Sequence, residues 1–253
     1  MYDKIHKKRK IGGIKMPSWG IHLAIANRVI NKLGKKLNEE EKDKFIFANV
    51  LPDINNGYVV KNISEVISHK LTHFEPKQYK GDYENKPGYI NFYEKYKSNL
   101  GNSIILGYYT HLMTDYYFNN TTYKEYGIYD ENNNRIGLKL NNGEEFIAEG
   151  EECRKIKVND FKLFAYYLYN NEKIEIPEYN ENMLEDIKNI EEINVTKEDI
   201  KETIKYINEC VEKPKIIFDE TIIKNYKIYT EEELKRRVDI CVDFIIENIE
   251  NKL

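Results

Sequence analysis

Hydrophobic residues recur every three to four positions along most of this chain, which is the spacing of a helix that buries one face. The clearest example is residues 99–118, where Leu100, Ile104 and Tyr108 form one apolar stripe. The same spacing predicts further helices over residues 18–33, 39–50, 63–73, 160–169, 182–193, 197–211 and 231–249. The pattern therefore predicts a mainly helical, all-α protein.

Residues 125–158 break this pattern. Asparagine-rich turn signals at residues 132–134 and 141–143 separate short runs that are typical of strands. These runs cover residues 135–140, 144–148 and 155–158. A small β-hairpin or meander is therefore predicted as an insertion in the helical protein. Because the insertion follows the 99–118 helix, which carries candidate site residues, we expect it to lie near the site.

No internal repeat and no low-complexity linker divides the sequence. Residues 16–253 are therefore predicted to form a single helical domain. Its parts are the helices of the candidate site at 16–120, the β insertion at 125–158 and packing helices at 159–253. Residues 1–15 form a basic tail that is expected to be disordered, with an RNA-binding or membrane-surface arm as the alternative.

Composition narrows the class of protein. The chain has 253 residues, of which 41% are hydrophobic and 32% charged. A net charge of −4 argues against a dedicated nucleic-acid surface, and no run approaches the roughly 18 apolar residues of a spanning helix. The start lacks the apolar stretch of a secretory signal, and the three cysteines are widely spaced: Cys153, Cys210 and Cys241. We therefore expect a cytoplasmic protein with reduced thiols.

Histidines and aspartates form the candidate site. Four of the five histidines lie between residues 22 and 111, and two aspartates accompany them. The set consists of His22, Asp53, His69, His73, His111 and Asp115. Imidazole nitrogens and carboxylate oxygens are ligands of zinc-type ions, so the set predicts a metal site in the N-terminal half.

His111 and Asp115 make the strongest case for a metal. A spacing of four places both side chains above one spot on the inward stripe of their helix. A buried carboxylate is costly unless it is paired, and no lysine or arginine shares the stripe as a counter-ion. Coordination of one ion would explain the pair. The alternative is that the histidines are satisfied core residues, as single histidines on apolar helix faces usually are.

His69 and His73 are also four residues apart. His73 lies nearer the apolar face and is the preferred ligand, whereas His69 lies further towards solvent, as a second candidate ligand, a substrate contact or a support for the ligands. Asp53 follows Pro52, which is expected to stop the preceding helix. Asp53 would then lie on a turn beside the core, where its carboxylate could bridge two ions.

Four segments resemble one known family. Residues 19–28, which begin Trp-Gly-Ile-His, resemble the opening helix of zinc-dependent phospholipases C, and the Trp-Gly pair resembles the start of the related S1/P1-type nucleases. Residues 51–53 (Leu-Pro-Asp) are similar to the family's bridging-aspartate turn, and residues 72–74 (Thr-His-Phe) to its His-aromatic step. Residues 107–115 resemble its HxxxD helix. The resemblance covers about residues 16–120.

This resemblance implies an all-helical fold that binds up to three zinc ions and hydrolyses phosphodiesters with a metal-activated water. It implies that Asp53, His73, His111 and Asp115 hold one ion, and that Trp19 and His22 lie beside a second. Asp53 is the predicted catalytic residue. The expected substrate is a small-molecule or lipid phosphoester, and no stable nucleic-acid partner is expected.

Two departures from the family pattern change the expected number of ions. The family's tryptophan is the mature N-terminus, whose free amine binds zinc, whereas Trp19 is internal unless the chain is cut after Ser18. The family also has a histidine and a glutamate beyond the HxxxD helix, where this chain has no histidine. Glu125, Glu144 or Glu149 could supply a carboxylate. We therefore expect one or two zinc ions, with manganese or iron as alternatives.

Two other functions compete with a phosphodiesterase. The fold could be retained in a non-catalytic binding protein whose metal is structural. An HD-type phosphohydrolase also combines histidine and aspartate on helices, but this chain has no adjacent His-Asp pair.

Overall fold

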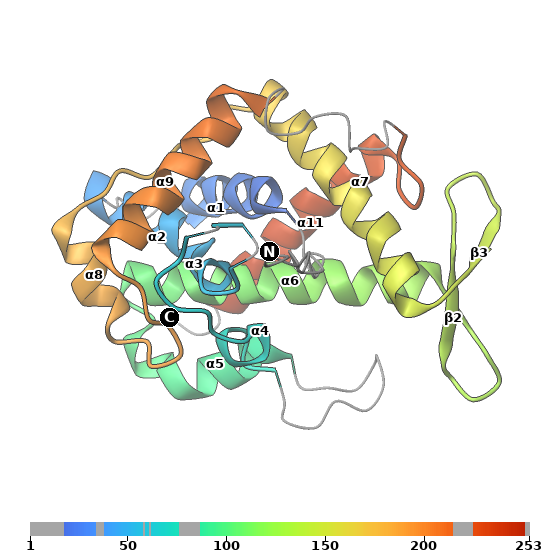
Figure 1. The fold of residues 1–253 in the computed structure, drawn as a ribbon, viewed down its shortest axis with the longest axis horizontal. Helices are drawn as coiled ribbons and strands as arrows, with labels where there is room; N and C mark the ends of the chain where they lie inside the picture. Colours follow the sequence, from blue (N-terminus) through green and yellow to red (C-terminus); the bar gives the residue numbers. More distant parts are fainter. Residues whose placement is uncertain are drawn as a thin grey trace, which may run out of the picture.

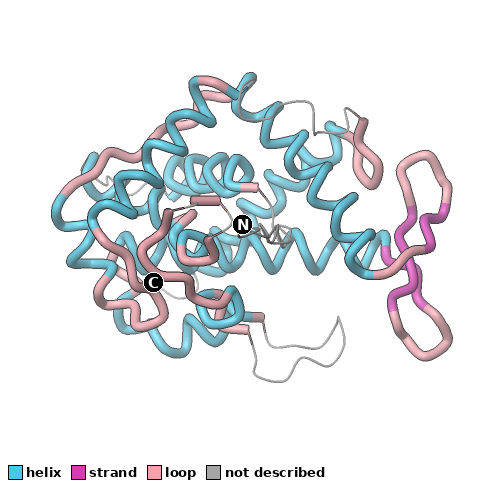
Figure 2. Tube along the Cα trace, viewed as in Figure 1, coloured by secondary structure: helices cyan, strands magenta, loops and turns pink. Residues whose placement is uncertain are grey.

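The fold is known from a computed structural model, which describes residues 18–33, 38–57, 59–60, 62–75, 87–214 and 225–250. The tail predicted at residues 1–15 lies outside this part of the chain. The described helices are α1 (Trp19–Leu33), α2 (Glu39–Ala48), α3 (Leu51–Ile54), α4 (His69–Thr72), α5 (Gly88–Tyr96), the 3-10 turn η1 (Lys97–Asn99), α6 (Ser103–Tyr126), α7 (Gly150–Asn171), α8 (Glu181–Ile187), α9 (Lys197–Glu212) and α11 (Glu231–Glu250). Helices dominate the described chain, which confirms the mainly helical class (Figures 1 and 2).

Polar side chains explain where several helices begin. Asn38, Asn102 and Asn180 each accept a hydrogen bond from a backbone N–H in the first turn of α2, α6 and α8. Thr196 and Asp199 form a reciprocal capping box at the start of α9. Such bonds satisfy N–H groups that lack a partner within the helix, and each contributes about 1 kcal/mol.

The long helix α6 packs closely against α2, and a glycine permits this approach (Figure 1). A Cβ at Gly107 would overlap the backbone carbonyl of Phe45 and would lie 2.7 Å from the Cβ of Ala48. Any larger residue would therefore push the two helices apart. His111 lies one turn beyond Gly107, so the close approach also brings the end of α2 next to a candidate ligand.

The β insertion forms a three-stranded antiparallel sheet in the order β1-β2-β3. Its strands are β1 (Gly127–Tyr129), β2 (Arg135–Lys139) and β3 (Glu145–Ile147). Gly137 pairs with Ile147 and Leu138 with Phe146 between the second and third strands. The predicted meander is confirmed in this part, and it projects beyond the helices at the far end of α6 (Figures 1 and 2).

Two expectations for the insertion are wrong. The sheet starts twelve residues after Asp115, which is about 18 Å further along α6 at 1.5 Å per residue, so it does not lie beside the candidate site. The run at 155–158 is part of α7, in which the buried Cys153, Lys157 and Phe161 follow a helical spacing of four. An apolar run this short has no decisive period of its own, and the longer helix around it determines its structure.

The helix predicted over residues 63–73 is also wrong, since only α4 is helical there. Polar contacts give the chain before α4 a different path. The backbone N–H of Ser64 donates to the Asp199 carboxylate at 2.9 Å, and the N–H of Ile67 donates to the carbonyl of Asn55 at 2.9 Å. These partners replace the hydrogen bonds that a helix would make within itself.

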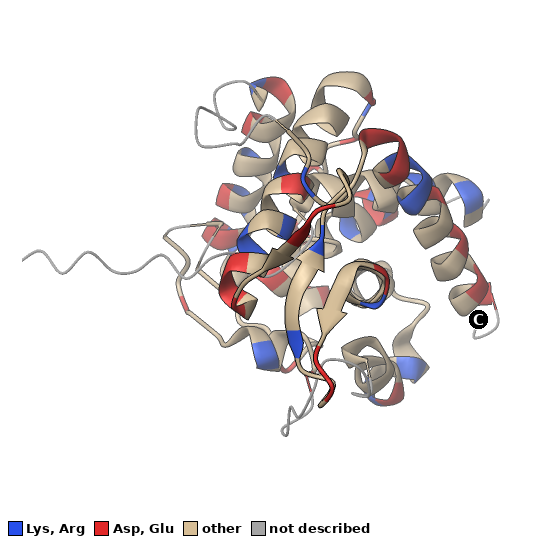
Figure 3. Ribbon diagram, turned by 90° about the vertical axis from the view of Figure 1, so that its right-hand side faces the viewer, with Lys and Arg blue, Asp and Glu red and all other residues tan. Residues whose placement is uncertain are grey.

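The surface reflects this different path. A helix over 63–73 would place Val66 and Leu71 on its apolar face, but they are 70% and 52% exposed. Elsewhere lysine, arginine and acidic residues are interspersed over the outer faces of the helices (Figure 3). Several form exposed pairs within one helix, as Lys205 does with Glu202 in α9, and each such pair contributes at most about 0.5 kcal/mol. Within the described ranges, the helices all fall short of the length and apolar character needed to cross a membrane.

Candidate metal centre

The structure brings the six predicted site residues together from four helices. One set, the long-helix group, consists of His22 on α1 with His111 and Asp115 on α6. The other, the short-helix group, consists of Asp53 on α3 with His69 on α4 and His73 directly after it. Within each group, one potential ligand atom of every residue lies within 4.8 Å of the others. Residues almost a hundred positions apart in sequence thus converge.

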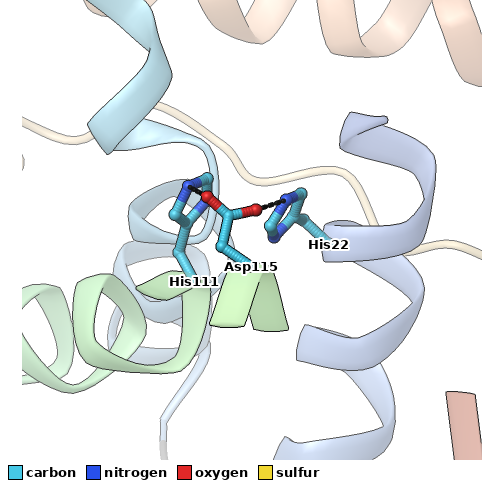
Figure 4. Close-up of side chains that lie close together, drawn as sticks. All are labelled: His22, His111 and Asp115. Atoms are coloured by element: carbon cyan, nitrogen blue, oxygen red, sulfur yellow. Dashed lines mark ion pairs between the residues drawn. The ribbon is translucent and has the colours of Figure 1, made fainter. Parts of the chain in front are cut away.

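Asp115 connects the two groups. Its Oδ1 lies 3.3 Å from His22 Nε2. Its Oδ2 lies 3.3 Å from His73 Nε2 and 3.5 Å from His111 Nε2. Figure 4 shows one oxygen of the Asp115 carboxylate directed towards His22 and the other towards His111. One carboxylate therefore faces three imidazoles, two of which belong to its own group.

The rings of His73 and His111 present their Nε2 atoms to each other. His111 Nδ1 lies 2.8 Å from the Asn49 carbonyl oxygen, and His73 Nδ1 lies 3.1 Å from the His69 carbonyl oxygen. The Thr72 hydroxyl, 2.9 Å from His73 Nδ1, donates its own proton to that same carbonyl. Because a carbonyl oxygen only accepts, we assign the proton of both rings to Nδ1, which leaves a lone pair on each Nε2.

These two lone pairs fit a metal ion. The Nε2 atoms of His73 and His111 lie 3.2 Å apart. Two nitrogens bound to a tetrahedral zinc at about 2.05 Å would lie about 3.3 Å apart, so the observed separation is that of two ligands of one ion. The distances of 3.3 and 3.5 Å from the same nitrogens to Asp115 Oδ2 agree with this geometry. Without a cation or proton between them, the two lone pairs would repel each other.

His22 is fully buried, yet neither of its ring nitrogens makes a hydrogen bond within the described residues. Its ring stacks on that of His111, with centroids 4.1 Å apart and planes 10° from parallel. Its Nε2 faces Asp115 at 3.3 Å. A buried imidazole without a hydrogen bond is costly, and coordination through Nε2 would remove that cost.

His69 lies at the outer edge of the centre. Its ring stacks on that of His73 at 3.6 Å, and its side chain is 18% exposed. Its Nδ1 lies 3.1 Å from the carboxylate of Glu75, a residue that sequence reasoning missed. The exposure agrees with the expectation that His69 lies further towards solvent than His73.

Asp53 has two hydrogen-bond donors beside it. The indole N–H of Trp19 donates to Oδ2 at 3.0 Å, and the amide of Asn56 donates to Oδ1 at 3.0 Å. Asp53 Oδ1 also lies 3.6 Å from His73 Nε2. An indole nitrogen offers no lone pair, so the side chain of Trp19 contacts a candidate ligand and is not itself one. The backbone nitrogen of Trp19 is joined to Ser18 by a peptide bond, so it is an amide and not a free amine.

Burial and the Asp115 charge set the protonation states. Burial lowers the pKa of His22, and it lowers the pKa of His73 to about 4. Burial acts in the same direction on His111, but the Asp115 carboxylate, together with Asp53 and the Asn49 carbonyl, outweighs it, and the pKa of His111 is raised. Burial would raise the pKa of Asp115, but His111 and the other imidazoles hold it well below its usual range. The ionised Asp115 and the neutral rings of His22 and His73 are in the state that metal ligands require, whereas His111 would have to give up its second proton to bind a metal ion.

Three glutamates named as possible extra ligands lie outside both groups. Glu125 forms an ion pair with the buried Arg237 at 2.5 Å. Glu144 and Glu149 are exposed, the first beside β3 and the second before α7. The residues that sequence reasoning missed are the supports Asn49, Asn56, Thr72 and Glu75. Of these, Asn56 left a signal, because it follows Asp53 by three residues and so shares one helical turn with it.

The fold and the centre define a class of mainly helical proteins that gather histidines and aspartates around a buried metal site. The sequence model of the family described as zinc-dependent phospholipase C matches residues 21–235, and the chain belongs to this family. Neither the comparison with curated proteins nor that with solved structures gave a significant match. Family and geometry together support a metal-dependent phosphoesterase in general.

Proposed function

We propose that this protein is a phosphodiesterase of phospholipase C type that uses one or two zinc ions, with manganese or iron as alternatives. The proposed ligands are His22, Asp53, His73, His111 and Asp115, with His69 as a weaker candidate and Trp19 beside the second ion. Family membership supports the reaction class, and the convergence of these side chains supports the metal. The expected substrate is a small-molecule or lipid phosphoester, and no stable nucleic-acid partner is proposed.

One observation carries this proposal. The Nε2 atoms of His73 and His111 lie 3.2 Å apart, and each ring has its other nitrogen next to a backbone carbonyl. Ordinary core histidines place a donor opposite an acceptor, whereas these two, when both rings are neutral, place acceptor opposite acceptor. Metal-binding histidines typically donate the remaining N–H to a carbonyl or carboxylate, as both rings do here.

In the proposed reaction, the metal ion and the side chains have different roles. When bound, zinc supplies positive charge that lowers the pKa of a coordinated water towards ~7 and offsets charge on phosphoryl oxygens. Asp53 is the proposed catalytic residue, whose carboxylate accepts the proton of the attacking water. Asp115 keeps three imidazoles directed to one place. His69 and Glu75, both partly exposed, mark the side from which a substrate would approach.

A second candidate is a structural metal in a non-catalytic binding protein. It is favoured by the burial of the centre, in which Asp53, His73 and Asp115 are at most 7% exposed and His22 and His111 are fully buried. Structural zinc sites are closed by four protein ligands, whereas catalytic sites keep one position for water. The partial exposure of His69 supports the catalytic alternative.

We also propose a cytoplasmic location and a single domain over residues 16–253. The location is supported by the cysteines, since Cys153, Cys210 and Cys241 are all free and buried. Free buried thiols are typical of reducing compartments. The single domain is supported by one continuous set of buried apolar residues that includes members of α1, α6 and α11.

Metal analysis and hydrolysis assays test the proposed function. The protein as purified should contain one or two zinc equivalents and should cleave a phosphodiester in a panel of phosphatidylcholine vesicles, bis-p-nitrophenyl phosphate and single-stranded DNA. A chelator should abolish cleavage, and zinc should restore it. A folded but inactive His111→Ala variant supports the enzyme, and an unfolded one supports a structural metal. Metal-loaded protein that cleaves nothing in the panel contradicts the enzyme.

A further inference from the structure

The Asp53 carboxylate is held on both oxygens by neutral donors. Trp19 Nε1 lies 3.0 Å from Oδ2, and Asn56 Nδ2 lies 3.0 Å from Oδ1. All three side chains belong to the buried set. The other amide atom of Asn56, Oδ1, has no hydrogen bond within the described residues. Among the described residues, the Asn56 side chain therefore makes its hydrogen bond to Asp53.

Asp115 offers the contrast. The neighbours described above for its carboxylate are the imidazoles of His22, His73 and His111, which are themselves candidate ligands. Trp19 and Asn56 approach Asp53 through N–H donors, which cannot bind a cation. Each Asp53 oxygen accepts one hydrogen bond and keeps a further lone pair. The donors therefore orient the carboxylate without using up its capacity to bind an ion.

The two donors reach Asp53 from different elements. Asn56 is the second residue after α3, and its backbone N–H also donates to the Asp53 carbonyl at 3.2 Å. Trp19 is the first residue of α1 and lies one turn before His22, so the two share a helix face. The indole thus ties the helix that carries His22 to the short helix that carries Asp53.

We propose that Trp19 and Asn56 are positioning residues that hold Asp53 in place for a metal ion bound with His73, His111 and Asp115. The inference rests on the proposed metal centre. Groups that orient ligands by hydrogen bonds typically contribute 10–100-fold to metal affinity. Removal of either donor is expected to lower zinc affinity by about this factor, since each holds one of the two oxygens.

The chain offers a matched control. Asn55 is the same residue type, adjacent and fully buried, but its amide donates to the carbonyls of Glu65 and Asn194. Asn55→Ala and Asn56→Ala therefore remove the same atoms from neighbouring positions, and only the second change touches Asp53. Trp19→Phe removes the indole N–H and keeps an aromatic ring in the core.

Zinc affinity of the full chain is the measurement, obtained by competition with a chromophoric chelator. Trp19 is the single tryptophan of the chain, so its fluorescence gives a second readout beside the carboxylate. The wild type and Asn55→Ala should saturate at the same zinc concentration. Trp19→Phe should need about 10–100-fold more zinc to saturate in the competition assay. Asn56→Ala should need the same excess of zinc in both assays.

The outcomes separate this inference from the proposed function. If the wild type binds no zinc, the metal centre itself is contradicted. If the wild type binds zinc and both Trp19→Phe and Asn56→Ala bind it equally tightly, the positioning role is overturned. An equal loss in Asn55→Ala would also overturn it, because general destabilisation would then explain the effect. Circular dichroism checks folding, and Asn56→Ser replaces Asn56→Ala if the latter does not fold.

Discussion

The two groups of the centre are built in different ways. The long-helix group lies on α1 and α6, which have 15 and 24 residues. The short-helix group lies on and beside α3 and α4, which have four residues each. Helices that short have little stability of their own. The first group is therefore fixed by helix packing, and the second by polar contacts such as those around Asp53 and Ser64.

The largest expected effect is at the residue that joins the groups. Asp115→Asn keeps the shape but removes the charge that three imidazoles face, so zinc affinity and hydrolysis should each fall by more than about 100-fold. Asp53→Asn should lower zinc affinity by a smaller factor, because its carboxylate lies near one of these imidazoles, whereas hydrolysis should fall as strongly as in Asp115→Asn because Asp53 is the proposed catalytic residue. Zinc competition and steady-state rates measure both variants. Equal losses of zinc affinity in the two variants would contradict the joining role of Asp115.

Acid should destabilise the metal-free protein through His73. Burial lowers the pKa of His73 to about 4, against 6.5 in an unfolded chain. The unfolded state therefore binds the proton first, and this contribution is complete above pH 6.5 and is lost as the pH falls towards 4. The loss is at most about 3 kcal/mol.

Urea unfolding of the metal-free wild type and of His73→Gln measures this contribution. The raised pKa of His111 acts in the opposite sense, since its stabilisation is present at low pH and is lost as the pH rises through the folded value. The difference between the two proteins cancels the His111 contribution to first order. Parallel pH curves for both proteins would show that His73 does not titrate in this way.

Packing of the long helices can be tested at Gly107. A methyl group there would meet Phe45 and Ala48, so Gly107→Ala should destabilise the protein by about 1–3 kcal/mol. It should also weaken zinc binding, because the carbonyl that orients His111 belongs to Asn49, the residue directly after α2. At Gly101 a Cβ would meet nothing within 4 Å, so Gly101→Ala should change stability by less than about 0.5 kcal/mol. Chemical denaturation that found no difference between the two would argue against the close approach.

The smallest effects should come from the segment before α4. Ser64→Ala removes one hydrogen bond to Asp199 and should cost about 1 kcal/mol. Val66→Ser should stay within about 0.5 kcal/mol, because Val66 is 70% exposed. Thermal unfolding measures both. A larger cost for Val66→Ser would support the helix that the sequence pattern predicted there.

The difference between the long-helix and short-helix groups also explains which parts of the structure could be predicted from the sequence. Periodicity predicted α6 and placed His111 and Asp115 on its inward face, because a long helix repeats its pattern over many turns. The periodicity gave wrong predictions at 63–73 and 155–158, because contacts with other parts of the protein determine the structure of such short runs. Ser64 meets Asp199, and that contact spans 135 positions in the chain.

Within the centre, residue type predicted the candidate ligands but not their supports. Histidine and aspartate carry a chemical signature of their own. Asn49 contributes a backbone carbonyl to His111, and no side-chain pattern reveals a carbonyl. Trp19 was expected beside a second ion because of the family resemblance, and that role stays a prediction. Its contact with Asp53 depends on how α1 packs against α3, which periodicity does not specify.

The central claim is that His73 and His111 share one cation, and anomalous diffraction from crystals of the zinc-loaded protein tests it directly. We predict a zinc peak about 2.0–2.1 Å from the Nε2 atoms of both residues. A zinc-loaded crystal in which these two nitrogens still face each other with no peak between them would contradict the claim.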